Sequence, residues 1–320
     1  MKLKKPNITF SKCYLCTQNT VVPSFNKLGY TVLKCKNCGL LSLDFNQEYS
    51  QFLKSYYQEG YFTGNKKLRA YANYADDKEN IAKNAQKLLN KADKYTKDGN
   101  LLDVGCAMGF FMEEAQKKGY KSYGIEVSDY AATIARKKFP KTIYKGSVED
   151  FLKNRTKIPQ FKGMNFDLIT LSDLIEHVND PREVLNGLKS MLKPKGIISI
   201  QTGDAGSFWA TLMGKNWHFY APPQHLYFFS QKTLTTLLKQ AGYELIKLEK
   251  VGKYVSLRYI FHMTQYMNIP VVGDYLNTII SSNTVGKISF PVKLFDNMIV
   301  FARLHLPDAR ASGRQARKSS

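Results

Sequence analysis

Residues 103–109 read Asp-Val-Gly-Cys-Ala-Met-Gly and join a short apolar segment to an amphipathic one. The apolar segment predicts a buried strand, and the amphipathic segment predicts a helix. Gly105 permits a sharp turn between them, because glycine adopts backbone conformations that other residues avoid. The small side chains of Ala107 and Gly109 allow a ligand to lie against bare backbone where the helix begins. This stretch therefore predicts a ligand site at the end of a strand.

A carboxylate further along the chain adds to this prediction. Glu126 lies 21 residues after Gly105 and ends the next predicted strand, where a carboxylate can accept hydrogen bonds from both hydroxyls of a ribose. A phosphate-binding dinucleotide turn would have glycines where Ala107 and Phe110 stand, so a nucleoside without phosphates fits better. Asp103, aimed at the same turn, would help to hold an ammonium group. Ribose and ammonium without phosphate describe S-adenosylmethionine.

From residue 100 onwards, short apolar segments alternate with helical patterns. This alternation, with short turns, predicts an α/β fold in which helices cover both faces of a mostly parallel sheet. Asp180 and Pro181 are the expected N-cap and first residue of one helix. The expected strands are 101–104, 122–126, 142–145, 166–171, 197–201, 245–251 and 298–304, and the expected helices are 108–118, 129–138, 181–192 and 233–240.

Four of the five cysteines form two C-x-x-C pairs, which 18 residues separate. These are Cys13, Cys16, Cys35 and Cys38. The spacing predicts a tetrahedral structural zinc site with no open coordination position, and residues 10–45 resemble a zinc ribbon. A redox-active pair is the weaker alternative, because no βαβ pattern surrounds these cysteines. Cys106, the fifth, is expected to be a small packing residue.

The chain of 320 residues carries 47 basic and 26 acidic side chains, a net charge of +21. The excess is +9 in residues 1–100, +4 in 101–200 and +8 in 201–320. Such a charge favours phosphates, nucleic acid or anionic lipid as neighbours, and a merely solvated lysine-rich surface explains it equally well. No apolar run reaches the length of a membrane span, and no signal peptide begins the chain, so we expect a cytoplasmic protein.

Residues 100–200 resemble a class I S-adenosylmethionine-dependent methyltransferase. The turn at 103–109 resembles the first motif of the family, and residues 166–181, which end in Glu-His-Val-Asn-Asp-Pro, resemble its fourth. The sequence departs from the family pattern at Ala107, where glycine is usual, and at Ser147, where aspartate is frequent. The resemblance implies a Rossmann-like, seven-stranded sheet whose last strand is antiparallel. It implies cofactor contacts by Asp103, Gly105, Ala107, Gly109, Glu126, Val148, Glu149 and Ser172.

A four-cysteine ribbon joined to such a domain further resembles bacterial sugar-modifying methyltransferases, some of which methylate carbon. In these proteins a tyrosine and a histidine are the suspected bases, which points here to Tyr220 and His225 in the loop after the fifth strand. The alternative for His225 is a structural role, ordering an aromatic loop. His177 is a third candidate, more suited to shaping the mouth of the cofactor pocket, and His218 is a weaker one.

Asp173, Glu176 and His177 approximate the carboxylate–histidine cluster with which some 2′-O RNA methyltransferases hold a divalent ion. The same letters occur widely in methyltransferases without a metal, which favours a metal-free site here.

We expect a zinc ribbon at 1–45, an aromatic-rich helical linker or cap at 46–98, a methyltransferase domain at 99–306 and a disordered basic tail at 307–320. The aromatic residues of the second segment either face a substrate or pack between the two neighbouring units. An insertion at 253–291 is expected to hold a helix that Pro270 ends. This insertion would cover an acceptor, contact a membrane or serve packing alone.

The sequence therefore predicts a methyltransferase that acts on a small molecule, such as a nucleotide-linked sugar or another glycan precursor whose phosphates suit the basic flanks. An RNA methyltransferase is the alternative, although no RNA-binding module is recognisable. A non-catalytic interaction protein built on a zinc ribbon is the third possibility. The acceptor atom and the oligomeric state do not follow from the sequence.

Overall fold

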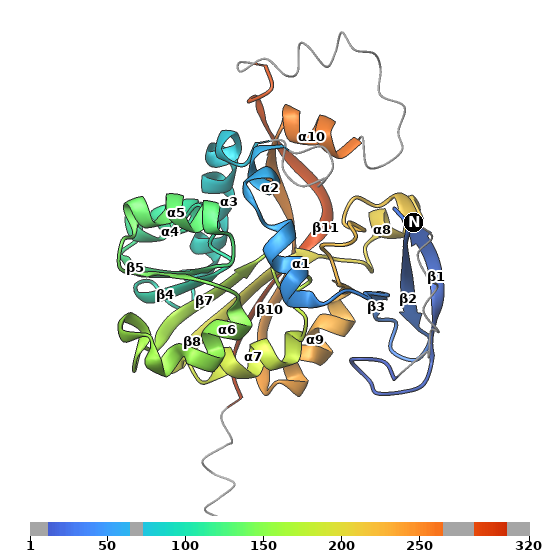
Figure 1. The fold of residues 1–320 in the computed structure, drawn as a ribbon, viewed down its shortest axis with the longest axis horizontal. Coiled ribbons are helices and arrows are strands. Elements are labelled where there is room, and N and C mark those ends of the chain that lie inside the picture. The colour runs from blue at the N-terminus through green and yellow to red at the C-terminus, as the bar shows by residue number, and fades with distance from the viewer. Residues whose placement is uncertain (1–11, 65–72, 265–284, 306–320) are drawn as a thin grey trace, which may run out of the picture.

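A seven-stranded sheet forms the centre of the protein, which a computed structural model describes at residues 12–64, 73–264 and 285–305 (Figure 1). Its strand order is β6-β5-β4-β7-β8-β11-β10. The first five of these strands pair in parallel, and β11 runs antiparallel to both β8 and β10. The strands are β4 (Gly99–Val104), β5 (Tyr120–Glu126), β6 (Ile143–Lys145), β7 (Phe166–Ser172), β8 (Leu192–Gly203), β10 (Tyr243–Ser256) and β11 (Ser289–Leu304). The predicted Rossmann-like α/β fold is confirmed.

Helices cover both faces of this sheet. In Figure 1, α3, α4 and α5 lie on one side of it, and α6, α7 and α9 lie on the other. Their bounds are α3 Lys78–Ala92, α4 Phe110–Lys117, α5 Asp129–Lys138, α6 Val148–Asn154, α7 Pro181–Lys189 and α9 Gln231–Gln240. Asp180 is the N-cap of α7, as predicted, and its side chain accepts a hydrogen bond from the backbone of Glu183.

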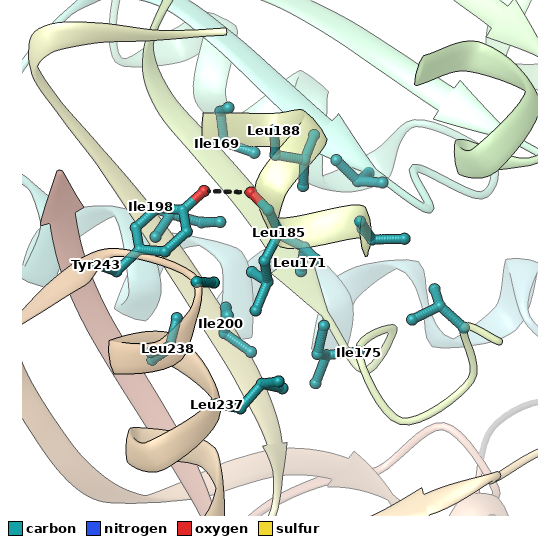
Figure 2. Close-up of a cluster of buried hydrophobic side chains, with 14 of the residues drawn as sticks. Ile169, Leu171, Ile175, Leu185, Leu188, Ile198, Ile200, Leu237, Leu238 and Tyr243 are labelled. Atoms are coloured by element: carbon teal, nitrogen blue, oxygen red, sulfur yellow. Dashed lines mark hydrogen bonds between the residues drawn. The ribbon is translucent and has the colours of Figure 1, made fainter. Parts of the chain in front are cut away.

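Two buried clusters pack these layers together, one on each face of the sheet. Neighbouring residues of β7 point to opposite faces, so Leu168 joins the cluster under α3 and α4 while Ile169 joins the cluster under α7 and α9. Figure 2 shows the second cluster, in which the Tyr243 hydroxyl donates a hydrogen bond to the Leu185 carbonyl oxygen at 2.8 Å. This core fixes the strand ends that carry the motifs.

The expected insertion at 253–291 differs from the structure, because β10 and β11 extend into it from both ends. Tyr254, which we expected in a helix, pairs with Pro291 in the antiparallel ladder. A register shift between Val251 and Lys253 lets the strand pass its expected end at Val251. The irregular pairing hides the strand pattern at this point, which explains the error.

Other helix boundaries also differ from expectation. The helix expected at 181–192 ends at Lys189, because Leu192 pairs with Phe166 in the sheet. In the expected insertion, only α10 (Leu257–Thr264) is helical among the described residues, and Pro270 lies outside them. The expected tail at 307–320 also lies outside the described residues.

The N-terminal cysteine segment forms a second sheet that the rest of the chain completes. Its strands are β1 (Val21–Lys27), β2 (Tyr30–Cys35), β3 (Leu41–Leu43) and β9 (Tyr227–Phe228), in the order β1-β2-β3-β9. In the β3–β9 pair, Leu41 pairs with Phe228 and Ser42 with Tyr227. The loop that carries His225 is therefore tied directly to the cysteine segment.

Two short helices, α1 (Tyr49–Tyr56) and α2 (Glu59–Thr63), connect this second sheet to α3. They lie near the ends of the central strands in Figure 1. Three more short elements follow β8 along the chain: α8 (Phe208–Met213), a single turn at 214–216 and β9. Within the described part of the chain, every helix is too short or too polar to cross a bilayer.

Candidate functional site

A cavity of about 270 Å³ opens at the carboxyl ends of β4, β5 and β7. Seven of the eight predicted cofactor residues line it: Asp103, Gly105, Ala107, Glu126, Val148, Glu149 and Ser172. Gly109 does not line it. A Cβ atom on Gly109 would lie 3.1 Å from the Phe139 ring, so this glycine allows close packing of α4 against the end of α5. The structure thus brings the motifs to one site and gives Gly109 a packing role.

The turn and the acid meet at the floor of this cavity. The Ala107 N–H donates to Glu126 Oε2 at 2.8 Å, and the Ser128 N–H donates to Glu126 Oε1 at 2.8 Å. A carboxylate has about four lone-pair positions, so two remain for the hydroxyls of a ribose. Burial raises the pKa of Glu126, and these backbone donors oppose the shift. The turn itself uses positive φ angles, +80° at Gly105 and +47° at Ala107.

Two other acids that line the cavity fit the remaining parts of S-adenosylmethionine. Asp103 accepts a hydrogen bond from Thr170 Oγ1 at 2.8 Å, and burial raises the pKa of Asp103 to about 7. A bound ammonium group would favour its ionised form. Both carboxylate oxygens of Glu149 are buried without a hydrogen-bond partner among the described residues, which suits an amino donor such as that of adenine.

Tyrosines from α1, its C-cap and α2 close one side of the cavity and reach the loops after β7 and β8. The hydroxyl of Tyr49 donates to the backbone oxygen of His177 at 3.2 Å, and that of Tyr57 lies 3.0 Å from His177 Nδ1. The hydroxyl of Tyr61 donates to Gln224 Oε1 at 3.2 Å. These tyrosines belong to the aromatic-rich segment predicted at 46–98, and none of them was assigned a role of its own. The only signal was the aromatic richness of the segment, which left a cap and simple packing open.

A smaller cavity of about 110 Å³ adjoins the first. The two share five lining residues: Tyr61, Asp173, His177, Lys253 and Tyr259. Lys253 Nζ donates to both oxygens of Asp173, at 2.8 and 2.6 Å. Asp173 stands at φ +50°, an uncommon conformation that often marks a functional site. Lys253 lies at the β10 irregularity, and the only role expected for it was a contact with lipid phosphates.

His177 and His225 meet at this second cavity, with ring centroids 4.6 Å apart. His225 Nδ1 lies 2.7 Å from the Phe219 carbonyl oxygen, so the proton is on Nδ1 and the lone pair is on Nε2. Burial lowers the pKa of His225 to about 4 and that of His177 well below its usual range. Both rings are therefore neutral near pH 7.

Glu176 lies beside the two histidines and is 2% exposed. Neither of its carboxylate oxygens has a hydrogen-bond partner within the described residues. Burial, followed by the nearby Asp173 charge, raises the pKa of Glu176 to about 8. This carboxyl therefore has unused capacity for a ligand.

The other two aromatic candidates have structural partners. Tyr220 lines the second cavity, but its ring packs against Phe25, Trp217 and Phe228, and burial raises its pKa to about 12. His218 Nε2 lies 3.7 Å from Asp296 Oδ2, and burial lowers the pKa of His218 to about 4. Of the predicted bases, His225 and His177 thus keep the best-placed ring nitrogens.

The four predicted metal-binding cysteines form a separate cluster. The Sγ atoms of Cys13, Cys16, Cys35 and Cys38 all lie within 4.8 Å of one another. The Cys13–Cys38 and Cys16–Cys35 sulfur pairs are each 3.6 Å apart. Sulfurs about 2.3 Å from a zinc ion in a tetrahedron lie roughly 3.8 Å apart, so the cluster fits zinc.

Known proteins resemble this chain in sequence. A family model described as a methyltransferase domain matches residues 73–248. A ubiquinone biosynthesis O-methyltransferase from Pasteurella multocida is 34% identical over 109 residues, which cover 32% of this chain and 45% of that protein. The chain thus spans less than half the length of this relative.

A protein of the same name from Pelagibacter ubique is 26% identical over 208 residues, which cover 59% of this chain and 82% of that protein. Among solved structures, a SAM-dependent methyltransferase from Archaeoglobus fulgidus aligns with a TM-score of 0.48 at 21% identity. That alignment covers 76% of this chain and 98% of the other.

Proposed function

This chain belongs to the methyltransferase domain family matched over residues 73–248, and from that premise we propose that it methylates a hydroxyl group of a small polar molecule. The observation that carries the proposal is the adjoining pair of cavities. The larger, which we call the cofactor cavity, is lined by seven of the predicted cofactor residues. The smaller, which we call the acceptor cavity, shares His177 and Lys253 with it and is also lined by His225.

S-adenosylmethionine supplies a methyl group on a positively charged sulfur, and the acceptor oxygen bonds to that carbon as the carbon–sulfur bond breaks. We assign the ribose to Glu126, the ammonium group to Asp103 and the adenine amino group to Glu149. The chain must align the two reactants and assist loss of the hydroxyl proton. We assign this assistance to the cluster of Glu176, His177 and His225, whose side chains line the acceptor cavity.

The tyrosine cap, formed by Tyr49, Tyr57 and Tyr61, covers one side of the cofactor cavity. Tyr57 and Tyr61 line the cofactor cavity and contact the loops that carry His177 and His225. A closed, water-poor site strengthens the electrostatic interactions within it and prevents hydrolysis. We propose that α1 and α2 therefore act as a substrate-facing cap.

The walls of the second cavity favour a polar acceptor. They include Asp173, Glu176, His218, Gln224 and Lys253, which offer hydrogen bonds to several hydroxyls at once. A nucleotide-linked sugar or another glycan precursor is the acceptor class that we propose. The names of the two curated relatives, which are O-methyltransferases, support oxygen as the acceptor atom.

A phenolic acceptor is the second candidate, and it rests on the words "ubiquinone biosynthesis" in the names of those relatives.

The test is a methyl-transfer assay with labelled S-adenosylmethionine and separate acceptors: nucleotide-linked sugars, catechols and total RNA. We expect the labelled methyl group to appear on a nucleotide-linked sugar. Label only in a catechol would favour the second candidate. Salt-sensitive label only in RNA would overturn both small-molecule proposals. Absence of cofactor binding by calorimetric titration would overturn the cofactor assignments themselves.

A further inference from the structure

The cluster of Glu176, His177 and His225 has a composition and geometry that the methyl-transfer proposal does not explain by itself. Each residue offers one ligand atom, and these three atoms all lie within 4.8 Å of one another. Two come from the turn after β7 and the third from the loop before β9. Hydrogen bonds from the backbones of Leu226 and Tyr227 to the Glu176 carbonyl oxygen hold the two segments together.

The protonation of His225 suits a ligand. Its Nδ1–H donates to the Phe219 carbonyl oxygen, which fixes the ring and leaves the lone pair of Nε2 available. Metal-binding histidines almost always hold their second ring nitrogen in this way. His177 has a comparable partner, because its Nδ1 lies 3.0 Å from the Tyr57 hydroxyl.

The buried carboxyl group of Glu176 supports a ligand at this cluster independently of the distances between the three ligand atoms. Its side chain is 2% exposed, and neither oxygen has a hydrogen-bond partner among the described residues. Buried carboxyl groups in proteins are paired, hydrogen-bonded or bound to a metal, or they keep their proton, as Glu176 does near pH 7 when no ligand is bound. Lys253, which lines the same cavity, is already bonded to both oxygens of Asp173. A cation at the cluster would give Glu176 the partner that it lacks.

We propose that Glu176, His177 and His225 bind one divalent transition-metal ion. Two imidazoles and one carboxylate suit Fe²⁺, Mn²⁺, Co²⁺ or Zn²⁺, and this site is separate from the four-cysteine cluster. All three side chains line the second cavity, so the remaining coordination positions of the ion open onto it.

The proposed function gives this ion a role, and this step rests on that proposal. A hydroxyl group bound to a divalent cation loses its proton more readily, so the ion would acidify the acceptor oxygen and hold it in place. An acceptor with two neighbouring oxygens would be favoured, because it can occupy two coordination positions. In this arrangement His225 holds the ion, and the proton released by the acceptor hydroxyl passes to bulk solvent.

The experiment uses the full chain with zinc in the cysteine cluster and titrates it with Co²⁺, in the absence of cofactor and acceptor. We expect one further cobalt ion per chain. Its absorption spectrum should show visible cobalt bands without the intense near-ultraviolet bands that thiolate ligands produce. The variants Glu176→Gln and His225→Asn should bind this ion at least ten-fold more weakly. His218→Asn is the matched control, since His218 lines the same cavity outside the cluster, and it should bind cobalt like the wild type.

The results separate this inference from the proposed function. No second cobalt ion in the wild type, or equal affinity in the wild type and in a folded Glu176→Gln variant, would overturn the metal site and leave methyl transfer standing. A bound cobalt ion in a chain that methylates none of the acceptors would leave the site standing and overturn the function. Glu176→Gln preserves the shape of the side chain, so we expect this variant to fold. A circular dichroism spectrum and a thermal melt identify any variant that does not.

Discussion

The two adjoining cavities differ in how far the chain itself satisfies their polar groups. In the cofactor cavity, backbone N–H groups hold both oxygens of Glu126, and Thr170 holds Asp103. In the acceptor cavity, Glu176 has no hydrogen-bond partner within the described residues, and both histidines are neutral. The carboxylates assigned to the ribose and the ammonium group are thus held before the cofactor arrives, whereas Glu149 in the same cavity and Glu176 in the other have no hydrogen-bond partner among the described residues until a ligand binds. Substitutions in the two cavities should therefore separate cofactor binding from turnover.

The largest effect is expected at His225. His225→Asn should lower the rate of methyl transfer by about 1000-fold, because it removes a ligand of the ion that acidifies the acceptor oxygen, and assistance to proton removal is worth about 10²–10⁴-fold. Its affinity for S-adenosylmethionine should stay unchanged, because His225 does not line the cofactor cavity. Steady-state kinetics and calorimetry measure the two quantities. The surface variant His305→Asn is the control, and equal losses of rate in both would contradict the assignment.

Glu126 should show the opposite behaviour. Glu126→Ala removes the acceptor of two buried backbone hydrogen bonds and of the proposed ribose contacts. Cofactor affinity should fall about 100-fold, or ~2.7 kcal/mol, which is the size expected for losing charge-assisted hydrogen bonds. Calorimetric titration measures it, with the exposed Glu59→Ala as control. A normal affinity in Glu126→Ala would show that the ribose binds elsewhere.

The cysteine cluster offers a way to disturb the acceptor cavity from a distance. Cys35→Ser should loosen the sheet in which β3 pairs with β9, and with it the loop that carries His225. Misplacement of a reacting group by about 1 Å can cost roughly 100-fold, so we expect a rate loss of roughly 30-fold with little change in cofactor affinity. Zinc content by elemental analysis and kinetics test this together. Full activity in a zinc-free variant would show that the acceptor cavity does not depend on the cysteine cluster.

The smallest effect concerns pH and belongs to the cofactor cavity. Burial raises the pKa of Asp103 to about 7, so acidification neutralises the carboxylate that should hold the ammonium group. The ionised form binds the cation, hence affinity should rise with pH and level off above pH 7. Between pH 8 and pH 6 we expect about a ten-fold loss, the consequence of one linked proton. Calorimetry across this range measures it, and Asp103→Asn should abolish the dependence.

The sequence predicted the cofactor cavity more fully than the acceptor cavity. Gly105 and Glu126 end neighbouring parallel strands, so a local motif and the topology rule suffice to bring them together. The cysteine pairs are similarly local. By contrast, Glu176 and His225 meet only because two distant loops pack together, and Lys253 reaches Asp173 through an irregular strand pair. No periodicity in the chain encodes such contacts.

The pairing of Leu41 with Phe228 also has a consequence for biosynthesis. While the chain leaves the ribosome, the N-terminal sheet ends in β3, whose outer edge has no neighbour until residues 227–228 emerge. An exposed edge strand is a template for pairing with other chains. Metal capture by the four thiols would order this half-finished sheet early and shorten the time that it can recruit a wrong strand. Zinc supply during expression should therefore govern the yield of monodisperse protein.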